Sequence, residues 1–244
     1  AIGGKIFFIT MSNQIQMLEN FVFLTDVNNS IIESVRYFGS HNFAGRNIPG
    51  YEAPRIICTK TAAQALGKAN QHFQQLGYTI VVYDGYRPAC SVEYFNTWAK
   101  DLSDTKMKRY YYPTLEKHQI IEQGYIAPIR SSHSRGSTFD LTLIENGKTL
   151  QEPQYRSIVL TNGELVPFLD DNTIDAGTSF DLFHPVSNHG TELITQEQTK
   201  RRNLLREVLD KYGFEPYQPE WWHYTLRNEP YPDQYFNFAI KNKT

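Results

Sequence analysis

Two short segments far apart in the sequence, Ser131–Asp140 and Glu220–His223, together provide two imidazoles and two carboxylates that can share one metal ion. A hydrolytic zinc site needs three ligands drawn from His, Asp, Glu or Cys, an open fourth position, and a carboxylate beside it that accepts a proton from water. The fold is constrained by this set, because the chain must bring both segments to one point. The candidate ligands are His133, Asp140 and His223, and Glu220 is left as the base.

The local sequence around each segment decides whether such a site can form. Gly136 permits a tight turn between His133 and the strand expected after it, so that the imidazole can fold back over that strand. On a flat strand Glu220 and His223 would point to opposite faces, so both can approach one metal only if the chain bends there. Pro219 favours such a bend. The alternative is an aromatic core strand whose histidine bonds a backbone carbonyl.

Hydrophobic periodicity predicts the elements around these segments. Apolar residues at intervals of three and four predict helices over 62–76, 88–102 and 195–213, and β-branched and aromatic runs predict strands over 78–83, 139–143 and 221–226. Alternation in the second of these strands puts Asp140 and Thr142 on one face, which would line the site. We therefore expect an α+β fold, with a central antiparallel sheet that carries the site and is flanked by helices.

Length and charge limit the classes of function. At 244 residues we expect one domain, and 24 basic against 26 acidic side chains give a formal charge of −2, without the basic field that nucleic acid or an anionic membrane requires. No apolar run approaches the ~20 residues of a spanning helix. A small neutral or zwitterionic substrate is favoured. The chain begins at Ala1, so we expect a processed or trimmed form, which leaves both the bacterial periplasm and the cytoplasm open; homo-oligomer formation is equally open.

Two other pairs of potential ligands indicate no second metal site. Cys58 and Cys90 fit no zinc motif, and their number leaves open one disulfide or two free thiols. His184 and His189 have no evident third ligand, so we expect them in a surface loop.

Several motifs, in order, carry a family resemblance. The Ser-x-His-x-x-Gly-x-x-x-Asp pattern at 131–140, Glu-x-x-His at 220–223 and Tyr83–Pro88 resemble the D-alanyl-D-alanine dipeptidases, the VanX-type zinc peptidases. The resemblance covers roughly residues 20–240, and a match of several motifs in order over this length argues against a chance similarity. Residues 1–19 have no counterpart, and we expect an N-terminal extension within a single domain over 1–244. Thr138 stands where the family pattern favours Ala; we expect it to point away from Asp140 as a packing adjustment.

The resemblance implies a complete set of roles. One Zn²⁺ per chain would be held by the three candidate ligands, and Glu220 would deprotonate the zinc-bound water. Arg87 would stabilise the tetrahedral intermediate; its alternative is a surface ion pair with Asp84. Asp181 would bind the substrate ammonium, unless it caps the turn at Gly177. The weaker candidates for substrate hydrogen bonds are Ser131 and Tyr37.

The implied reaction is hydrolysis of the dipeptide D-Ala-D-Ala to two D-Ala. A pocket that pairs both substrate termini would exclude longer chains. The alternatives are a D,D-carboxypeptidase that acts on longer peptidoglycan peptides, a non-catalytic zinc-stabilised module that binds cell-wall peptides, and an aromatic interaction protein. The presence of Glu220 and Arg87 argues against the binding module, because binding alone needs neither a base nor an oxyanion partner.

Overall fold

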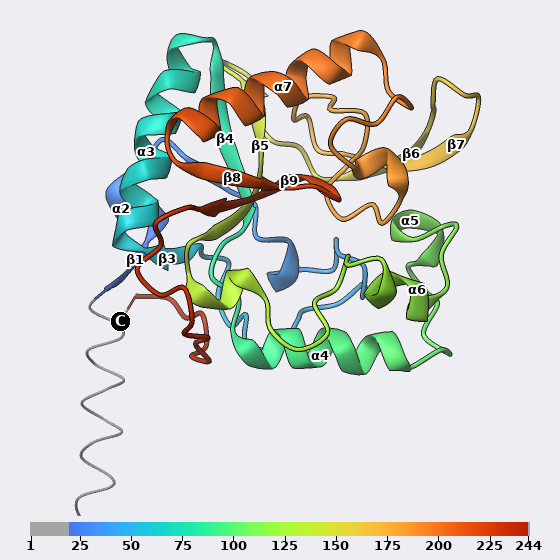
Figure 1. The fold of residues 1–244 in the computed structure, drawn as a ribbon, viewed down its shortest axis with the longest axis horizontal. Coiled ribbons are helices and arrows are strands. Elements are labelled where there is room, and N and C mark those ends of the chain that lie inside the picture. Colours follow the sequence, from blue (N-terminus) through green and yellow to red (C-terminus); the bar gives the residue numbers. More distant parts are fainter. Residues whose placement is uncertain (1–19, 244) are drawn as a thin grey trace, which may run out of the picture.

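A five-stranded sheet forms the centre of the structure, a computed structural model that describes residues 20–243 (Figure 1). The N-terminal extension expected at 1–19 lies outside the described residues. The strands are β1 (Phe21–Phe23), β2 (Ile32–Glu33), β3 (Ile57–Thr59), β4 (Tyr78–Asp84), β5 (Thr138–Glu145), β6 (Gln154–Val159), β7 (Leu165–Asp170), β8 (Phe214–Tyr217) and β9 (Glu220–Leu226). The helices are α2 (Leu24–Val27), α3 (Lys60–Gln75), α4 (Ala89–Lys100), α5 (Lys108–Tyr111), α6 (Lys117–Glu122) and α7 (Gln196–Lys211), with short 3₁₀ turns η1 (Arg36–Phe38), η2 (Ser132–Arg135) and η3 (Pro185–Ser187).

The central sheet is mixed rather than purely antiparallel. Its order is β2-β4-β5-β9-β8, and the three pairings among β4, β5, β9 and β8 are antiparallel as expected. The expectation of an antiparallel sheet fails at one edge, because β2 runs parallel to β4. Parallel neighbours need a long crossover, and the chain between β2 and β4 contains β3 and helix α3. The site lies at β5 and β9, within the antiparallel part.

Helices lie on both sides of this sheet. In Figure 1, α3 and α7 lie side by side along one face, while α4, α5 and α6 lie on the opposite side. The three predicted helices are confirmed as α3, α4 and α7, and α7 begins with a capping box, in which Thr195 and Gln198 bond each other's backbone N–H. Strand β5 is buried from Thr138 to Ile144, so its polar residues lie inside the molecule.

Two irregularities in strand pairing direct polar side chains toward one point. Between Val82 and Asp84 the register of β4 against β5 shifts, which makes Asp84 the partner of Asp140. Between Pro216 and Tyr217 the register of β8 against β9 also shifts. Such bulges bend a strand and redirect its side chains. The bend that Glu220 and His223 need in order to approach one metal ion is therefore present at the start of β9.

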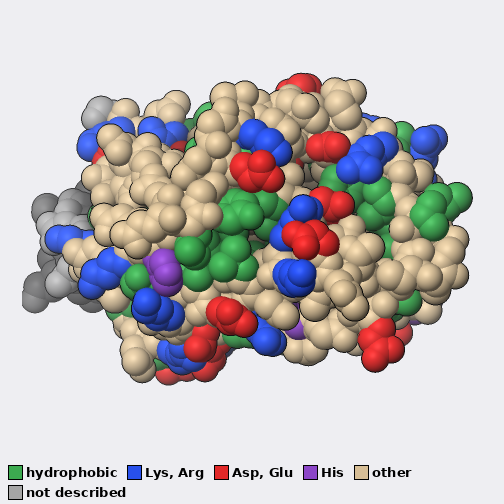
Figure 2. Space-filling view, turned by 90° about the horizontal axis from the view of Figure 1, so that it is seen from above, with side chains coloured by type: hydrophobic (Ala, Val, Ile, Leu, Met, Phe, Trp, Pro, Cys, Tyr) green, Lys and Arg blue, Asp and Glu red, His purple; other side chains and the backbone are tan. Residues whose placement is uncertain are grey.

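Strands β6 and β7 form a separate antiparallel hairpin at one end of the molecule (Figure 1). Both cysteines are free thiols, which settles the alternative that the sequence left open. None of the helices within residues 20–243 combines the length and the apolar character that a membrane crossing needs. On the face shown in Figure 2, basic and acidic side chains are interspersed, in keeping with the small net charge.

Candidate metal centre

His133 is presented by the short turn η2, whose ends are both fixed. At its start, the Ser131 hydroxyl accepts a hydrogen bond from the backbone N–H of His133 at 3.3 Å. At its end, Gly136 has φ 86°, a left-handed conformation that favours glycine. A Cβ atom on Gly136 would also lie 2.3 Å from the ring of Phe21. The tight turn predicted from Gly136 is thus confirmed.

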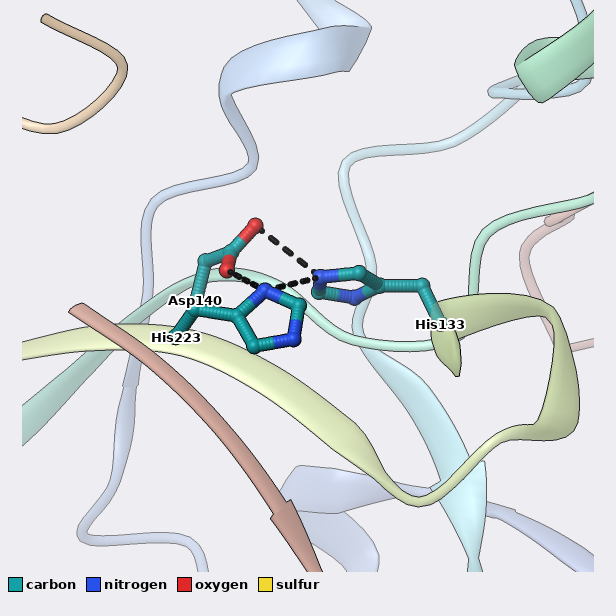
Figure 3. A group of neighbouring side chains, drawn as sticks. All are labelled: His133, Asp140 and His223. Atoms are coloured by element: carbon teal, nitrogen blue, oxygen red, sulfur yellow. Dashed lines mark hydrogen bonds and ion pairs between the residues drawn. The ribbon is translucent and has the colours of Figure 1, made fainter. Parts of the chain in front are cut away.

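Asp140 and His223 come from adjacent strands and are direct partners in the β5–β9 register. Figure 3 shows both side chains pointing toward the imidazole of His133. Nε2 of His133 lies 3.2 Å from Oδ2 of Asp140, and Nδ1 of His223 lies 3.2 Å from Oδ1. The two imidazole nitrogens are 3.3 Å apart. The three predicted ligands thus meet from two distant segments, as a group that could hold a metal ion.

The remaining ring nitrogens are bonded elsewhere. Nδ1 of His133 donates to the carbonyl of Gly85 at 2.8 Å, which leaves a lone pair on Nε2. Nε2 of His223 lies 3.3 Å from Oγ of Ser132, which can accept its proton and leave Nδ1 free. Such outer partners are typical of metal-bound histidines.

The donor atoms fit a tetrahedral ion. Zinc bonds of 2.0–2.2 Å at tetrahedral angles imply donor separations of about 3.3–3.6 Å, and the nearest donor atoms here lie 3.2–3.3 Å apart. Oδ1 of Asp140 is buried and accepts no hydrogen bond from the described residues, although Nδ1 of His223 is near. Converging nitrogen and oxygen lone pairs of this kind can hold a cation between them.

Charge reinforces this arrangement. Burial by itself would raise the pKa of Asp140, but the close His133 imidazole, followed by that of His223, holds this pKa well below its usual value. Burial lowers the pKa of His223, which favours the neutral imidazole that metals bind. The group therefore combines one carboxylate with an imidazole, that of His223, in the form that metals bind.

Arg87 joins this group from the loop after β4. Its Nε donates to Oδ2 of Asp84 at 2.9 Å, and its Nη2 lies 3.4 Å from Oδ2 of Asp140. The ion pair with Asp84 that was the alternative role does exist, but it is buried rather than superficial, with 11% exposure for the arginine and 0% for the aspartate. Among the described residues no hydrogen bond engages Nη1 of Arg87. A positioned guanidinium thus faces the group.

Glu220 lies beside His223, the third candidate ligand. Its Oε2 is 3.5 Å from Nδ1 of His223, which the bend in β9 makes possible. The side chain is buried. Burial, followed by the negative charges of Asp140 and Asp181, raises the pKa of Glu220 well above its usual value. A carboxylate with increased proton affinity therefore lies next to the candidate metal ligands.

Asp181 is a buried carboxylate with one close partner. Its Oδ2 accepts a hydrogen bond from the Tyr37 hydroxyl at 2.8 Å, and burial, followed by the charge of Asp140, raises its pKa well above the usual value. The alternative role at the Gly177 turn is wrong, because Asp175 accepts the hydrogen bond from Gly177 N–H at 2.9 Å. Asp181 has φ 61°, a conformation that non-glycine residues rarely adopt.

A single cavity of about 500 Å³ connects these residues. Its lining includes every predicted site residue: Tyr37, Arg87, Ser131, His133, Asp140, Asp181, Glu220 and His223. Ser132, Tyr125 and Tyr217 also line it and were not foreseen. Ser132 sits beside His133 in the recognised motif, so the motif could have suggested it, whereas neither tyrosine has a local signal.

Two expectations near the site are wrong. Thr138 was expected to point away from Asp140, but residues two apart on a strand share a face, and its Oγ1 lies 2.9 Å from that of Thr225 in the cavity wall. His184 and His189 were expected on a surface loop, but both are buried. Nε2 of His184 lies 3.1 Å from Glu164, and neither histidine belongs to a metal-binding group within residues 20–243.

Comparison with known proteins agrees with this geometry. Residues 17–151 and 168–241 match the family model described as D-ala-D-ala dipeptidase; the stretch between them contains β6 and the start of β7. A D-alanyl-D-alanine dipeptidase of Enterococcus faecalis is 39% identical over 224 residues, which are 92% of this chain and 100% of that protein. A D-alanyl-D-alanine dipeptidase of Streptomyces coelicolor is 35% identical with the same coverage. One of Escherichia coli is 23% identical over 79% of this chain and 77% of its own length.

Proposed function

The chain belongs to the D-Ala-D-Ala dipeptidase family, and from this premise we propose that it hydrolyses D-Ala-D-Ala to two molecules of D-Ala with the help of one zinc ion. The observation that carries the proposal is the convergence of His133, Asp140 and His223, with Glu220 and Arg87 around them, in one cavity. The matched residues extend over most of the chain, which supports a single domain.

His133, Asp140 and His223 would hold the metal through Nε2, the carboxylate and Nδ1, since these atoms face one another and the other ring nitrogens are occupied. When bound, zinc supplies a Lewis acid that polarises the scissile carbonyl and makes a water molecule more acidic at neutral pH. Imidazole and carboxylate ligands suit zinc, although other divalent ions accept the same donors.

Glu220 would act as the general base and then as the general acid. It takes a proton from the attacking water as the water oxygen bonds the carbonyl carbon, and it delivers that proton to the leaving nitrogen as the C–N bond breaks. Its location 3.5 Å from His223 supports this role, because the carboxylate lies beside the ligands without replacing any of them. Two amino acids result, and Glu220 is restored.

Arg87 would bind the oxyanion that forms when water adds to the carbonyl. Its position is set by Asp84, which the Tyr51 hydroxyl also holds through a 2.7 Å hydrogen bond. A guanidinium fixed in this way provides donors and full charge where negative charge develops, without reorganising during the reaction.

The substrate ammonium would pair with Asp181. A buried carboxylate whose close partner is one hydroxyl, that of Tyr37, is costly unless a cation binds it. Tyr37 then contributes through its hydrogen bond to Asp181, and the Ser131 hydroxyl lines the cavity on the side of η2. The small cavity suits a dipeptide.

Replacing Arg87 with Lys should lower kcat for D-Ala-D-Ala by about 10²- to 10³-fold, the usual effect of losing one oxyanion donor. Lysine retains the charge but not the planar fork that reaches both Asp84 and Asp140. Steady-state kinetics would measure this effect. Arg55→Lys is the matched control, since Arg55 pairs with Glu33 at 3.2 Å and does not line the cavity. An unchanged kcat in Arg87→Lys would remove Arg87 from the reaction.

The proposed function is tested by measuring D-Ala release from D-Ala-D-Ala by the zinc-loaded and the chelated protein, with L-Ala-L-Ala and a D-Ala-D-Ala-terminated pentapeptide in parallel. We expect hydrolysis of the D,D-dipeptide alone, lost on chelation and restored by zinc. Cleavage of the pentapeptide in place of the dipeptide would assign a D,D-carboxypeptidase. No hydrolysis by fully loaded protein would assign a peptide-binding module.

A further inference from the structure

We propose that Tyr217 sets the length of the substrate, because its bond to Gly124 closes the cavity on the side where the leaving amino acid lies. This inference rests on the proposed function and identifies a specificity-determining residue for it. We name the contact between the Tyr217 hydroxyl and the Gly124 carbonyl the Tyr217–Gly124 strap.

The strap connects two segments of the cavity lining. Tyr217 is the last residue of β8, and Gly124 follows helix α6. The tyrosine hydroxyl donates to the Gly124 carbonyl oxygen at 3.0 Å, and both residues line the cavity. The tyrosine ring also lies with its centroid 5.2 Å from that of His223. The strap therefore passes close to the candidate metal ligands rather than along a remote edge.

The walls are shaped for this contact. Gly124 has φ 83°, and a Cβ atom on it would lie 2.7 Å from the tyrosine oxygen. Any other residue there would push the Tyr217 hydroxyl away, so the close approach depends on glycine.

Each wall is anchored without the strap. On one side, Gly124 N–H donates to the Ile121 carbonyl and Tyr125 N–H to the Ile120 carbonyl, both at 3.0 Å, which ties the loop to the end of α6. The amide of Asn96 donates to the Ala127 carbonyl at 2.9 Å. On the other side, β8 is paired with β9. Loss of the strap should thus open the cavity without unfolding either wall.

The position of the strap indicates which end of the substrate it limits. Tyr217 is the direct partner of Glu220 across the β8–β9 pair. In the proposed mechanism Glu220 delivers its proton to the leaving nitrogen, which places the carboxyl-terminal residue beside Glu220, on the side of its strand partner Tyr217. The ammonium is assigned to Asp181 and Tyr37, which belong to other segments. A residue added at the carboxyl end would therefore meet the Tyr217–Gly124 strap.

The test compares kcat/KM of the zinc-loaded enzyme for D-Ala-D-Ala, for D-Ala-D-Ala-Gly, extended at the carboxyl end, and for Gly-D-Ala-D-Ala, extended at the amino end. In Tyr217→Ala, the ratio for D-Ala-D-Ala-Gly relative to D-Ala-D-Ala should rise about tenfold or more over wild type, while the ratio for Gly-D-Ala-D-Ala stays constant. Tyr217→Phe, which loses only the hydroxyl, should give a smaller rise. Leu165→Ala removes an exposed side chain, 67% accessible, from the β6–β7 hairpin and should change neither ratio.

An unchanged ratio in Tyr217→Ala, or an equal rise for both extended peptides, would overturn the role of the strap. Thermal unfolding of each variant checks that the fold persists. Wild-type enzyme that does not hydrolyse D-Ala-D-Ala would overturn the proposed function and the strap together, whereas dipeptide hydrolysis with an unchanged ratio would overturn the strap alone.

Discussion

Replacing Glu220 with Gln should lower kcat for D-Ala-D-Ala by about 10²- to 10⁴-fold, the usual contribution of a general base, while the protein still binds one zinc ion per chain. Glutamine has the same shape but cannot accept the proton of the attacking water. The donor atoms of His133, Asp140 and His223 remain in place, because Glu220 contacts this group only at 3.5 Å from His223. Steady-state kinetics and metal analysis of the same sample measure both effects.

The matched control is Glu215→Gln. Glu215 lines the same cavity from β8 but is exposed and does not belong to the metal-binding group. Its kcat should stay within about twofold of wild type, as for most exposed substitutions. Should Glu220→Gln lose its zinc, Glu220 would be a ligand rather than the base; should it retain full activity, another group must accept the proton.

The candidate site was predictable because its candidate ligands and base occur within two short sequence motifs. Two short segments that carry the candidate ligands, a glycine that allows the η2 turn and a proline before Glu220 were all visible in the sequence. Long periodic elements were predictable for the same local reason, and α3 and α7 begin and end close to their expected residues. The bulges in β4 and β9 were not, since they are fixed by pairing with distant strands.

Other features depended on contacts that no local pattern specifies. Three features depend on residues that are far apart in the chain. They are the parallel pairing of β2 with β4, the burial of His184 and the Tyr217–Gly124 strap. The β6–β7 hairpin is different, because Asn162-Gly163 lies between two apolar runs and is a recognised hairpin signal. This hairpin could have been predicted from the sequence. The family model leaves out most of it, so no resemblance indicated it.

Replacing Asp140 with Asn should abolish zinc binding and reduce hydrolysis of D-Ala-D-Ala below detection. Asp140 is the centre of the group: His133 and His223 each lie 3.2 Å from one of its oxygens, and Arg87 lies 3.4 Å from Oδ2. Asparagine keeps the size of the side chain but loses the negative charge that offsets the cation, and its neutral amide is a poor ligand for zinc. Because the variant lacks the zinc ion, a higher substrate concentration should not restore the activity.

Thermal unfolding gives a second measurement that does not depend on activity. A ligand that binds only the folded state stabilises it by about 2.7 kcal/mol at a free concentration one hundred times its Kd. Zinc should therefore raise the unfolding temperature of the wild type and leave that of Asp140→Asn unchanged. Asp175→Asn is the control: it weakens the turn at Gly177 but should keep the zinc-dependent rise, because Asp175 lies outside the metal-binding group. A zinc-dependent rise in Asp140→Asn equal to that of the wild type would mean that the ion binds elsewhere and that the three converging side chains are not its ligands.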